Sequence, residues 1–201
     1  MTDIMMQLKE KTAPQHHRAE QNRYTAAMLN RTMTLEQYGE YLAKFYGFVR
    51  PLEQRLEERP EWRRIGFDIS ARMKSRLLEA DLAGLGWSGQ AIINAPDCHA
   101  LPDVSTFPRA LGCLYVLEGS TLGGQMLTKL LVKYLPVSPD TNARYLNSYG
   151  DAVRARWDEF RGMLTGLAHS GEDEREMLAA AGETFDRLHH WLEQSSGTSS
   201  R

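Results

Sequence analysis

A histidine near the N-terminus has a carboxylate one helical turn away. Thr12, His16 and Glu20 stand four residues apart, so on a helix they share one face. A carboxylate at that distance can hold the proton of one imidazole nitrogen and orient the other nitrogen towards a metal ion. His17 points about 100° away and cannot serve this face. We therefore treat His16 as a candidate metal ligand, with a histidine satisfied by structural contacts as the alternative.

Three glycines stand close together in an otherwise apolar stretch. The spacing of its apolar residues predicts a half-buried helix over 114–134. Gly119 and Gly123 would share one face of that helix, with Gly124 beside them. Each interior glycine costs about 1 kcal/mol relative to alanine, so something must come close to this backbone. Either another helix crosses closely there, or a flat ligand lies on the glycines; they also allow a bend.

Other catalytic patterns are missing from the sequence. A ferritin-like di-iron site needs Glu-x-x-His pairs, and no histidine here has a glutamate three residues before it. There is no phosphate-binding glycine loop with its lysine, no Cys-x-x-Cys and no Gly-x-Ser-x-Gly elbow. A planar metal complex between the histidine and the glycine patch is the chemistry that remains.

The elements that must position these groups are helical. We expect an all-α bundle of about six to eight helices in a single domain, residues 1–194, followed by a disordered tail, 195–201. Pro14 should kink or restart the first helical segment, and a capping box at Thr34 should open the next helix. The stretch 87–108 should be irregular. The expected helices cover 4–29, 34–58, 70–82, 114–134, 148–167 and 173–194.

Composition narrows the class of protein. The 201 residues carry a net charge of -2 with mixed signs, which gives no indication of a nucleic-acid or membrane surface. No apolar run reaches the roughly 18 residues of a membrane span, and the N-terminus becomes charged too early for a secretory signal. Cys98 and Cys113 do not make a disulfide framework. We expect a cytoplasmic protein.

Three segments together resemble the haem oxygenase family. LKEKTAPQHHRAEQN, residues 8–22, resembles its proximal helix, Leu-Lys-Glu-x-Thr-x-x-x-His-x-x-Ala-Glu. EGSTLGGQ, 118–125, is similar to its glycine-rich distal helix, and LLEADLAGLG, 77–86, to its Leu-x-x-Asp-Leu element. The segments occur in the family's order and span nearly the whole ordered chain. The resemblance implies a helical bundle with haem sandwiched between a proximal helix and a bent, glycine-rich distal helix.

The resemblance also implies roles for single residues around haem. His16 would be the axial iron ligand and Glu20 its orienting partner. Lys9 matches a basic residue that meets a haem propionate, and Tyr115 matches a tyrosine that lies near a propionate in bacterial members. Tyr46 resembles a tyrosine that lines the distal pocket. Further propionate contacts would come from one or more of Arg154, Arg156 and Arg161, among which the resemblance does not choose.

On the distal side the resemblance assigns catalysis to Gly119, Ser120 and Gly123. The glycines would lie over the porphyrin, with Gly124 beside them. Mammalian-type members place an aspartate at the position of Ser120, where it organises the water that protonates bound peroxide. A hydroxyl can donate or accept a hydrogen bond but carries no charge. Ser120 therefore motivates a second hypothesis, a haem-binding carrier or sensor without turnover.

The activity implied is that of a bacterial haem oxygenase. Haem would be both cofactor and substrate, and O2 and electrons would convert it to biliverdin with release of CO and Fe2+. The sequence has no flavin or iron–sulphur motif, so a ferredoxin or an NAD(P)H-dependent reductase would supply the electrons. The GGQ ending of the distal segment favours members that supply biliverdin to a phytochrome after cleavage at the α-meso carbon. A thiamin-degrading enzyme on a similar bundle is a third hypothesis, and it would not need His16.

Overall fold

The computed structural model describes residues 3–168 and 170–194, and this part of the chain contains helices and turns but no strand. The all-α class is therefore confirmed. The described residues form ten α-helices and two 3-10 turns, more than the six to eight expected, because the first segment is divided and two helices have only one turn. The tail expected at 195–201 lies outside the described residues. In chain order the elements are α1 (Ile4–Lys11), α2 (Ala13–Glu20), α3 (Arg23–Leu29), α4 (Leu35–Glu57), α5 (Glu61–Arg64), η1 (Ser70–Arg72), α6 (Ser75–Gly84), α7 (Gly89–Ile93), α8 (Phe107–Leu131), η2 (Gly150–Ala152), α9 (Val153–Leu167) and α10 (Gly171–Glu193).

Local signals explain why the N-terminal segment is three helices. Pro14 stands in the first turn of α2, where a missing N–H breaks no helical hydrogen bond, so it restarts the helix. The Asn22 side chain accepts hydrogen bonds from the N–H groups of Tyr24 and Thr25 and so begins α3. The capping box predicted at Thr34 is present and begins α4.

Other boundaries also differ from the sequence-based ones; the helix predicted over 114–134 is α8, which begins at Phe107 and ends at Leu131. The predicted helix over 70–82 is divided into η1 and α6, because the Glu53 carboxylate accepts hydrogen bonds from the N–H groups of Lys74 (2.6 Å) and Ser75 (3.0 Å) and ends the turn there. The stretch 87–108 contains the short α7. The helix predicted over 148–167 begins only at Val153, as α9. The residues before it form a run of turns that ends in η2.

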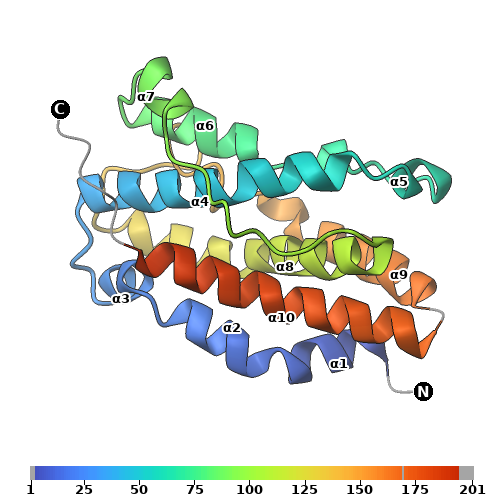
Figure 1. Cartoon of the computed structure of the whole chain (residues 1–201). Helices are drawn as coiled ribbons and strands as arrows, with labels where there is room; N and C mark the ends of the chain where they lie inside the picture. The colour runs from blue at the N-terminus through green and yellow to red at the C-terminus, as the bar shows by residue number, and fades with distance from the viewer. Residues whose placement is uncertain (1–2, 169, 195–201) are drawn as a thin grey trace.

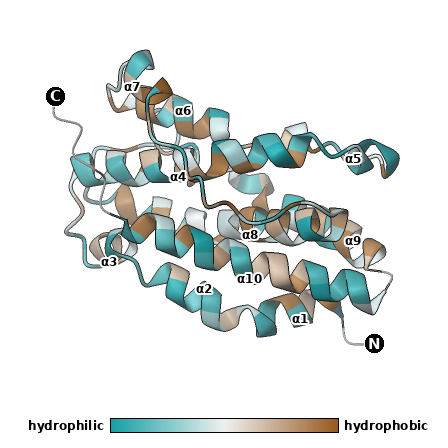
Figure 2. Cartoon of the chain, viewed as in Figure 1, coloured by the Kyte–Doolittle hydropathy of each residue, from teal (hydrophilic) through white to brown (hydrophobic). Residues whose placement is uncertain are grey.

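The long helices pack around α8. Helix α10 lies between α8 and α2 in Figure 1, and its most extensive contacts are with α8. Gly112 of α8 permits this approach, since a Cβ atom there would collide with the carbonyl group of Met177. Helix α4 packs against α6 on the other side of the bundle. Buried apolar residues from Ile4 to Leu192 form one cluster, whereas Figure 2 shows hydrophilic residues along the outward side of α2.

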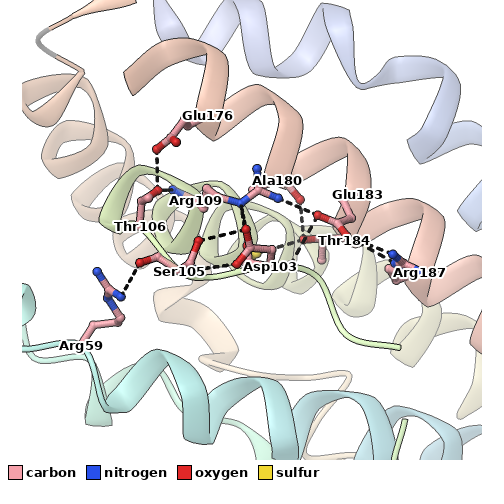
Figure 3. Close-up of polar contacts among 11 residues, drawn as sticks. Arg59, Asp103, Ser105, Thr106, Arg109, Glu176, Ala180, Glu183, Thr184 and Arg187 are labelled. Atoms are coloured by element: carbon pink, nitrogen blue, oxygen red, sulfur yellow. Dashed lines mark hydrogen bonds and ion pairs between the residues drawn. The ribbon is translucent and has the colours of Figure 1, made fainter. Parts of the chain in front are cut away.

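Polar contacts fix the first turn of α8 onto α10, as Figure 3 shows. The Thr106 hydroxyl accepts from the N–H of Arg109 (3.3 Å) and donates to the Glu176 carboxylate (2.5 Å). The Arg109 guanidinium lies between the carboxylates of Asp103 (2.9 Å) and Glu183 (2.7 Å).

Among the described residues, no helix is long and apolar enough to cross a bilayer.

Candidate functional site

A cavity of about 660 Å³ lies between α2 and the middle of α8. Its volume falls within the roughly 300–1,000 Å³ of small-molecule and cofactor sites, and its lining is mainly apolar. Every long helix contributes to the wall, together with the run of turns before α9. The aromatic side chains that line it are Tyr41, Phe45, Tyr115, Tyr145, Trp157 and Phe185.

His16 and Glu20 meet at one side of this cavity. The His16 Nε2 atom lies 3.3 Å from the Glu20 carboxylate, and the imidazole stacks on the Phe185 ring at a centroid distance of 5.0 Å. The His16 side chain is 55% exposed, so it is open to a ligand. The carboxylate faces Nε2, which leaves Nδ1 as the second ring nitrogen in this rotamer. Thr12 does not join the pair: it is buried, and its hydroxyl donates to the Leu8 carbonyl (2.6 Å).

Two neighbours of His16 lie at the edge of the same cavity. His17 has its own contact one turn later, with its Nε2 atom 2.9 Å from the Gln21 side-chain nitrogen. Lys9, on α1, is exposed at the rim, where an ammonium group can meet an anionic substituent of a ligand. The apolar interior with Lys9 at its rim suits a ligand that has an apolar body and an acidic group at its edge.

The three glycines in the middle of α8 support different interpretations of the sequence: one permits close packing, and another leaves the helix surface open. A Cβ atom at Gly124 would lie 2.5 Å from the Leu146 carbonyl oxygen, so this glycine permits close packing, against a loop instead of the helix expected. A Cβ atom at Gly123 would meet nothing within 4 Å, and that position is open to the cavity. At Gly119 a Cβ atom would lie 3.7 Å from the Trp157 ring, an ordinary contact. Gly123 therefore gives the helix its flat, open surface.

The apolar spacing in this stretch predicts one buried stripe along the helix, and this prediction is partly wrong. The stripe comprises Leu111, Tyr115, Leu122, Met126, Leu130 and Tyr134. Leu122 and Met126 are 39% and 64% exposed, and both line the cavity beside Gly123. The buried side of the helix instead includes Leu114, Leu117 and other residues one or two turns away. The middle of α8 is apolar on both sides because one side meets the core and the other meets the cavity, so periodicity alone does not distinguish them.

A segment that the sequence-based analysis did not select forms another wall. This segment, residues 141–150, belongs to the connection between α8 and α9, and we call it the strap. The buried Asp81 of the Leu-x-x-Asp-Leu element accepts hydrogen bonds from the N–H groups of Arg144 (2.9 Å) and Tyr145 (2.8 Å). Burial raises the pKa of the Asp81 carboxyl, and these two hydrogen bonds oppose that rise. The Leu-x-x-Asp-Leu element thus holds the strap in place from α6.

The strap is also tied to α8. The Leu146 carbonyl lies against Gly124, and the Gln125 side chain donates to the Gly150 carbonyl (2.7 Å). Tyr149 has φ 66°, a left-handed conformation that is unusual for a bulky residue. Its hydroxyl donates to a carboxylate of α8 described next. These contacts hold the strap against the same helix turns that carry the glycines.

That carboxylate is Glu118, the residue before Gly119. It is buried, and it receives hydrogen bonds from Arg72 (2.8 Å), Lys74 (2.5 Å) and the Tyr149 hydroxyl (2.9 Å). Arg72 extends the cluster to Glu159 of α9 (2.8 Å). Burial, with the nearby Glu118 charge, raises the pKa of Tyr149. The cluster joins η1, α8, α9 and the strap. In the sequence, the sign of this cluster is a glutamate within an apolar helix.

Tyr46 does not lie at the cavity, so the structure does not support a place in the distal pocket for it. It is buried on α4, and its hydroxyl accepts a hydrogen bond from Arg50 (3.1 Å), which is itself paired with Asp97 (2.6 Å). Tyr41 and Phe45 line the cavity from the same helix. Tyr46 follows Phe45 by one residue and therefore points about 100° away from it.

The arginines of α9 lie on different sides of their helix. Trp157 lines the cavity, and its ring lies 5.8 Å from that of Tyr115. Arg154 and Arg161 stand three residues before and four residues after Trp157, so they share its face. Arg156 instead lies beside Glu159 (3.3 Å) and gives its carbonyl to the buried Arg72.

Comparisons with known proteins agree with this arrangement. A family model described as Heme oxygenase matches residues 2–194. The heme oxygenase PigA of Pseudomonas aeruginosa is 27% identical over 163 residues, covering 80% of this chain and 78% of that protein. A heme oxygenase of Xanthomonas campestris is 26% identical over 157 residues, covering 77% and 88%.

Solved structures show the same fold. Heme oxygenase from Leptospira interrogans has a TM-score of 0.77 at 18% identity, covering 95% of this chain and 98% of that one. The NO- and CO-bound enzyme from Neisseria meningitidis has a TM-score of 0.77 at 21% identity, covering 98% and 96%. Heme oxygenase-1 from Synechocystis in complex with heme has a TM-score of 0.74 at 17% identity, covering 95% and 91%. This chain belongs to the haem oxygenase family.

Proposed function

We propose that this chain binds haem in the cavity between α2 and α8 and cleaves it to biliverdin, with O2 and externally supplied electrons, releasing CO and Fe2+. The observation that carries this proposal is the combination at one apolar cavity of an exposed, carboxylate-paired His16 with the open helix surface at Gly123. A flat macrocycle with a central metal fits both features. The His16 imidazole can bind the metal, and the open helix surface at Gly123 lets a flat ring lie close to the backbone.

Each side of the cavity has a separate task in this proposal. His16 would bind the iron through Nδ1 in the present rotamer, since Glu20 lies against Nε2, or through Nε2 after the imidazole turns so that Glu20 holds Nδ1. The bound haem supplies the iron at which O2 is activated. Gly123 leaves space on the opposite side, and Gly119 adds no bulk beyond its contact with Trp157. Contact with haem would cover Leu122 and Met126, whose exposure is otherwise unfavourable.

The acidic edge of haem is assigned to the basic and hydroxyl groups at the rim. Lys9 is exposed there, and burial raises the pKa of Tyr115, so its phenol keeps the proton that it can donate to a carboxylate. Arg154 and Arg161 share the Trp157 face of α9, and we choose them over Arg156, which is committed to Glu159. Arg161 would have to leave its long contact of 3.8 Å with Asp158.

The partners follow from the reaction. Electrons would come from a ferredoxin or an NAD(P)H-dependent reductase that approaches the open edge of the cavity. A cytoplasmic location is proposed because such donors are found there. The GGQ sequence at residues 123–125 supports α-meso cleavage and a phytochrome as acceptor of the biliverdin.

The test is an absorption spectrum of the protein with one equivalent of haemin, followed as reductant and O2 are added with catalase present. We expect the haem band to decline as a biliverdin band grows, and chromatography of the product to identify the cleaved position. A haem spectrum that persists, with electrons shown to reach the iron, would favour a carrier or sensor instead. Failure to bind haemin would exclude both functions.

A matched pair of variants tests the proximal assignment. His16→Ala should remove the axial-ligand spectrum, while His17→Ala should retain it, because the two side chains point in different directions on α2. Loss of the ligand in His17→Ala alone would transfer the role to that residue. The pair is well matched because both side chains are exposed and each has a polar partner four residues later, Glu20 for His16 and Gln21 for His17.

A further inference from the structure

Arg72 connects two walls of the cavity from behind them. Its Nη1 atom donates one hydrogen bond to the Glu118 carboxylate of α8 (2.8 Å) and another to the Arg156 carbonyl of α9 (3.0 Å). Its Nη2 atom forms an ion pair with Glu159 of α9 (2.8 Å) that lies outside hydrogen-bond geometry. The Arg72 side chain is 1% exposed and does not line the cavity. Because a buried charge is costly to separate from its partners, these contacts fix α9 relative to α8.

The residue after Arg156 is Trp157, which lines the cavity. Its ring lies 5.8 Å from the Tyr115 ring of α8, and a Cβ atom at Gly119 would be 3.7 Å from it. Helix α9 packs mainly on α8, with smaller contacts to η2 and α1. Because Arg72 holds the carbonyl directly before Trp157, it fixes the place of this ring in the cavity wall.

The same face of α9 carries groups that we assign to the acidic edge of haem. Arg154 and Arg161 share the face of Trp157, so a shift of α9 against α8 would move both guanidinium groups together with the ring. Haem has its propionates at one edge only. Moving the partners of the propionates therefore rotates the macrocycle within its own plane, and a different meso carbon comes to face the open helix surface at Gly123.

We infer that Arg72 is a positioning residue for haem. By joining Glu118 of α8 to the Arg156 carbonyl of α9, it sets where Trp157 meets the macrocycle, and through α9 it sets the in-plane orientation of haem. Arg72 acts only through these neighbours, since it does not line the cavity itself. The inference rests on the proposed function and deepens it, because it concerns how the bound haem is oriented.

Arg72→Lys tests the inference in the full chain. Lysine keeps the charge beside Glu118, but its side chain is one bond shorter and ends in a single nitrogen instead of a planar fork. It therefore cannot hold Glu118 and α9 together as arginine does. Arg59→Lys is the matched control. The Arg59 guanidinium also joins two groups, the Ser105 carbonyl (2.8 Å) and the Glu61 carboxylate (2.9 Å), and it does not line the cavity.

Two nuclear magnetic resonance signals report the outcome. In the ligand-free protein, the indole N–H resonance of Trp157, assigned by its absence in Trp157→Phe, should shift in Arg72→Lys and stay in place in Arg59→Lys. In the cyanide complex of the haemin-loaded protein, the proton resonances of the haem methyl groups report the in-plane orientation, and their pattern should change in Arg72→Lys alone. The ratio of biliverdin isomers should change with it, roughly two- to tenfold, the range of one net hydrogen bond. A loss of stability alone would move neither the methyl pattern nor the isomer ratio.

Glu159→Gln is a second variant, and it carries the test if Arg72→Lys does not fold. The Glu159 side chain is 56% exposed, so the substitution removes the ion pair at little cost to folding. Both signals should shift as in Arg72→Lys but by less, because the hydrogen bond to the Arg156 carbonyl remains. A methyl pattern unchanged in the folded variants, or changed equally in Arg59→Lys, would overturn the inference. Failure of the wild-type protein to bind haemin would overturn both proposals, whereas binding without turnover would refute only the oxygenase reaction, since the methyl pattern does not depend on it.

Discussion

Alanine at Gly124 and alanine at the adjacent Gly123 should change the stability of the ligand-free protein in opposite directions. Both substitutions gain about 1 kcal/mol of helix propensity. At Gly123 the new methyl group meets nothing within 4 Å, so most of that gain should remain. At Gly124 it would lie 2.5 Å from the Leu146 carbonyl oxygen, closer than the 3.0 Å that Cβ contacts essentially always exceed. The strap or the helix must shift, at a cost of about 1–3 kcal/mol.

The two variants should therefore differ by about 1–3 kcal/mol, which corresponds to roughly 2–12 °C in unfolding midpoint for a protein of this size. Thermal and denaturant unfolding of the ligand-free variants, followed by circular dichroism, measures this directly. Haemin titration should give the reverse order, because the methyl group at Gly123 occupies the surface that the ligand needs. If both alanines stabilise the ligand-free protein equally, the strap does not pack against Gly124 as described.

Three further predictions concern the buried polar groups. Asp81→Asn should destabilise by about 1–3 kcal/mol in denaturant unfolding, because one amide oxygen replaces two carboxylate oxygens that accept separate N–H groups; full stability would mean that the strap is held by other contacts. Glu118→Gln should cost more, about 3–5 kcal/mol, since it leaves Lys74 buried without its anion and Arg72 with Glu159 alone; a loss no larger than that of Asp81→Asn would refute this order. The Cys113 thiol should react with iodoacetamide only after unfolding, because burial raises its pKa to about 12, whereas a free thiol has a pKa of about 8.5. Between those values the unfolded chain loses the thiol proton that the folded chain keeps, so this group makes stability fall as the pH rises; rapid alkylation of the native protein at pH 8 would contradict the burial.

Local patterns predicted the helices well where their causes are local. The capping box at Thr34 lies within four residues, and it begins α4 as expected. Pro14 marked a break, but its position in the first turn of α2 depended on where the preceding helix ended. The division between η1 and α6 depends on Glu53, a side chain about twenty residues earlier in the chain, and no local pattern indicates that contact.

The same distinction applies to the site. The spacing of His16 and Glu20 brings them to 3.3 Å because the helix itself sets that distance. Tyr145 reaches the cavity only because Asp81, on another helix, holds its backbone. An aspartate within an apolar helical repeat was the available signal, since a buried carboxylate needs partners. The sequence contains that signal but not the identity of the partners.

The structure also explains how α8 tolerates glycines in its middle. The glycines at 119, 123 and 124 together forgo about 3 kcal/mol of helix propensity relative to alanine. Glu118 holds the turn before Gly123 through a buried network to η1, α9 and the strap, and Gly124 lies directly against the strap backbone. The helix is therefore supported on both sides of the short stretch that faces the cavity. That stretch can remain bare because its conformation is maintained by tertiary contacts and not by its own side chains. Removing the Glu118 network should accordingly loosen amide hydrogen exchange at residues 119–123 before it affects α10, and uniform loosening of both helices would contradict this account.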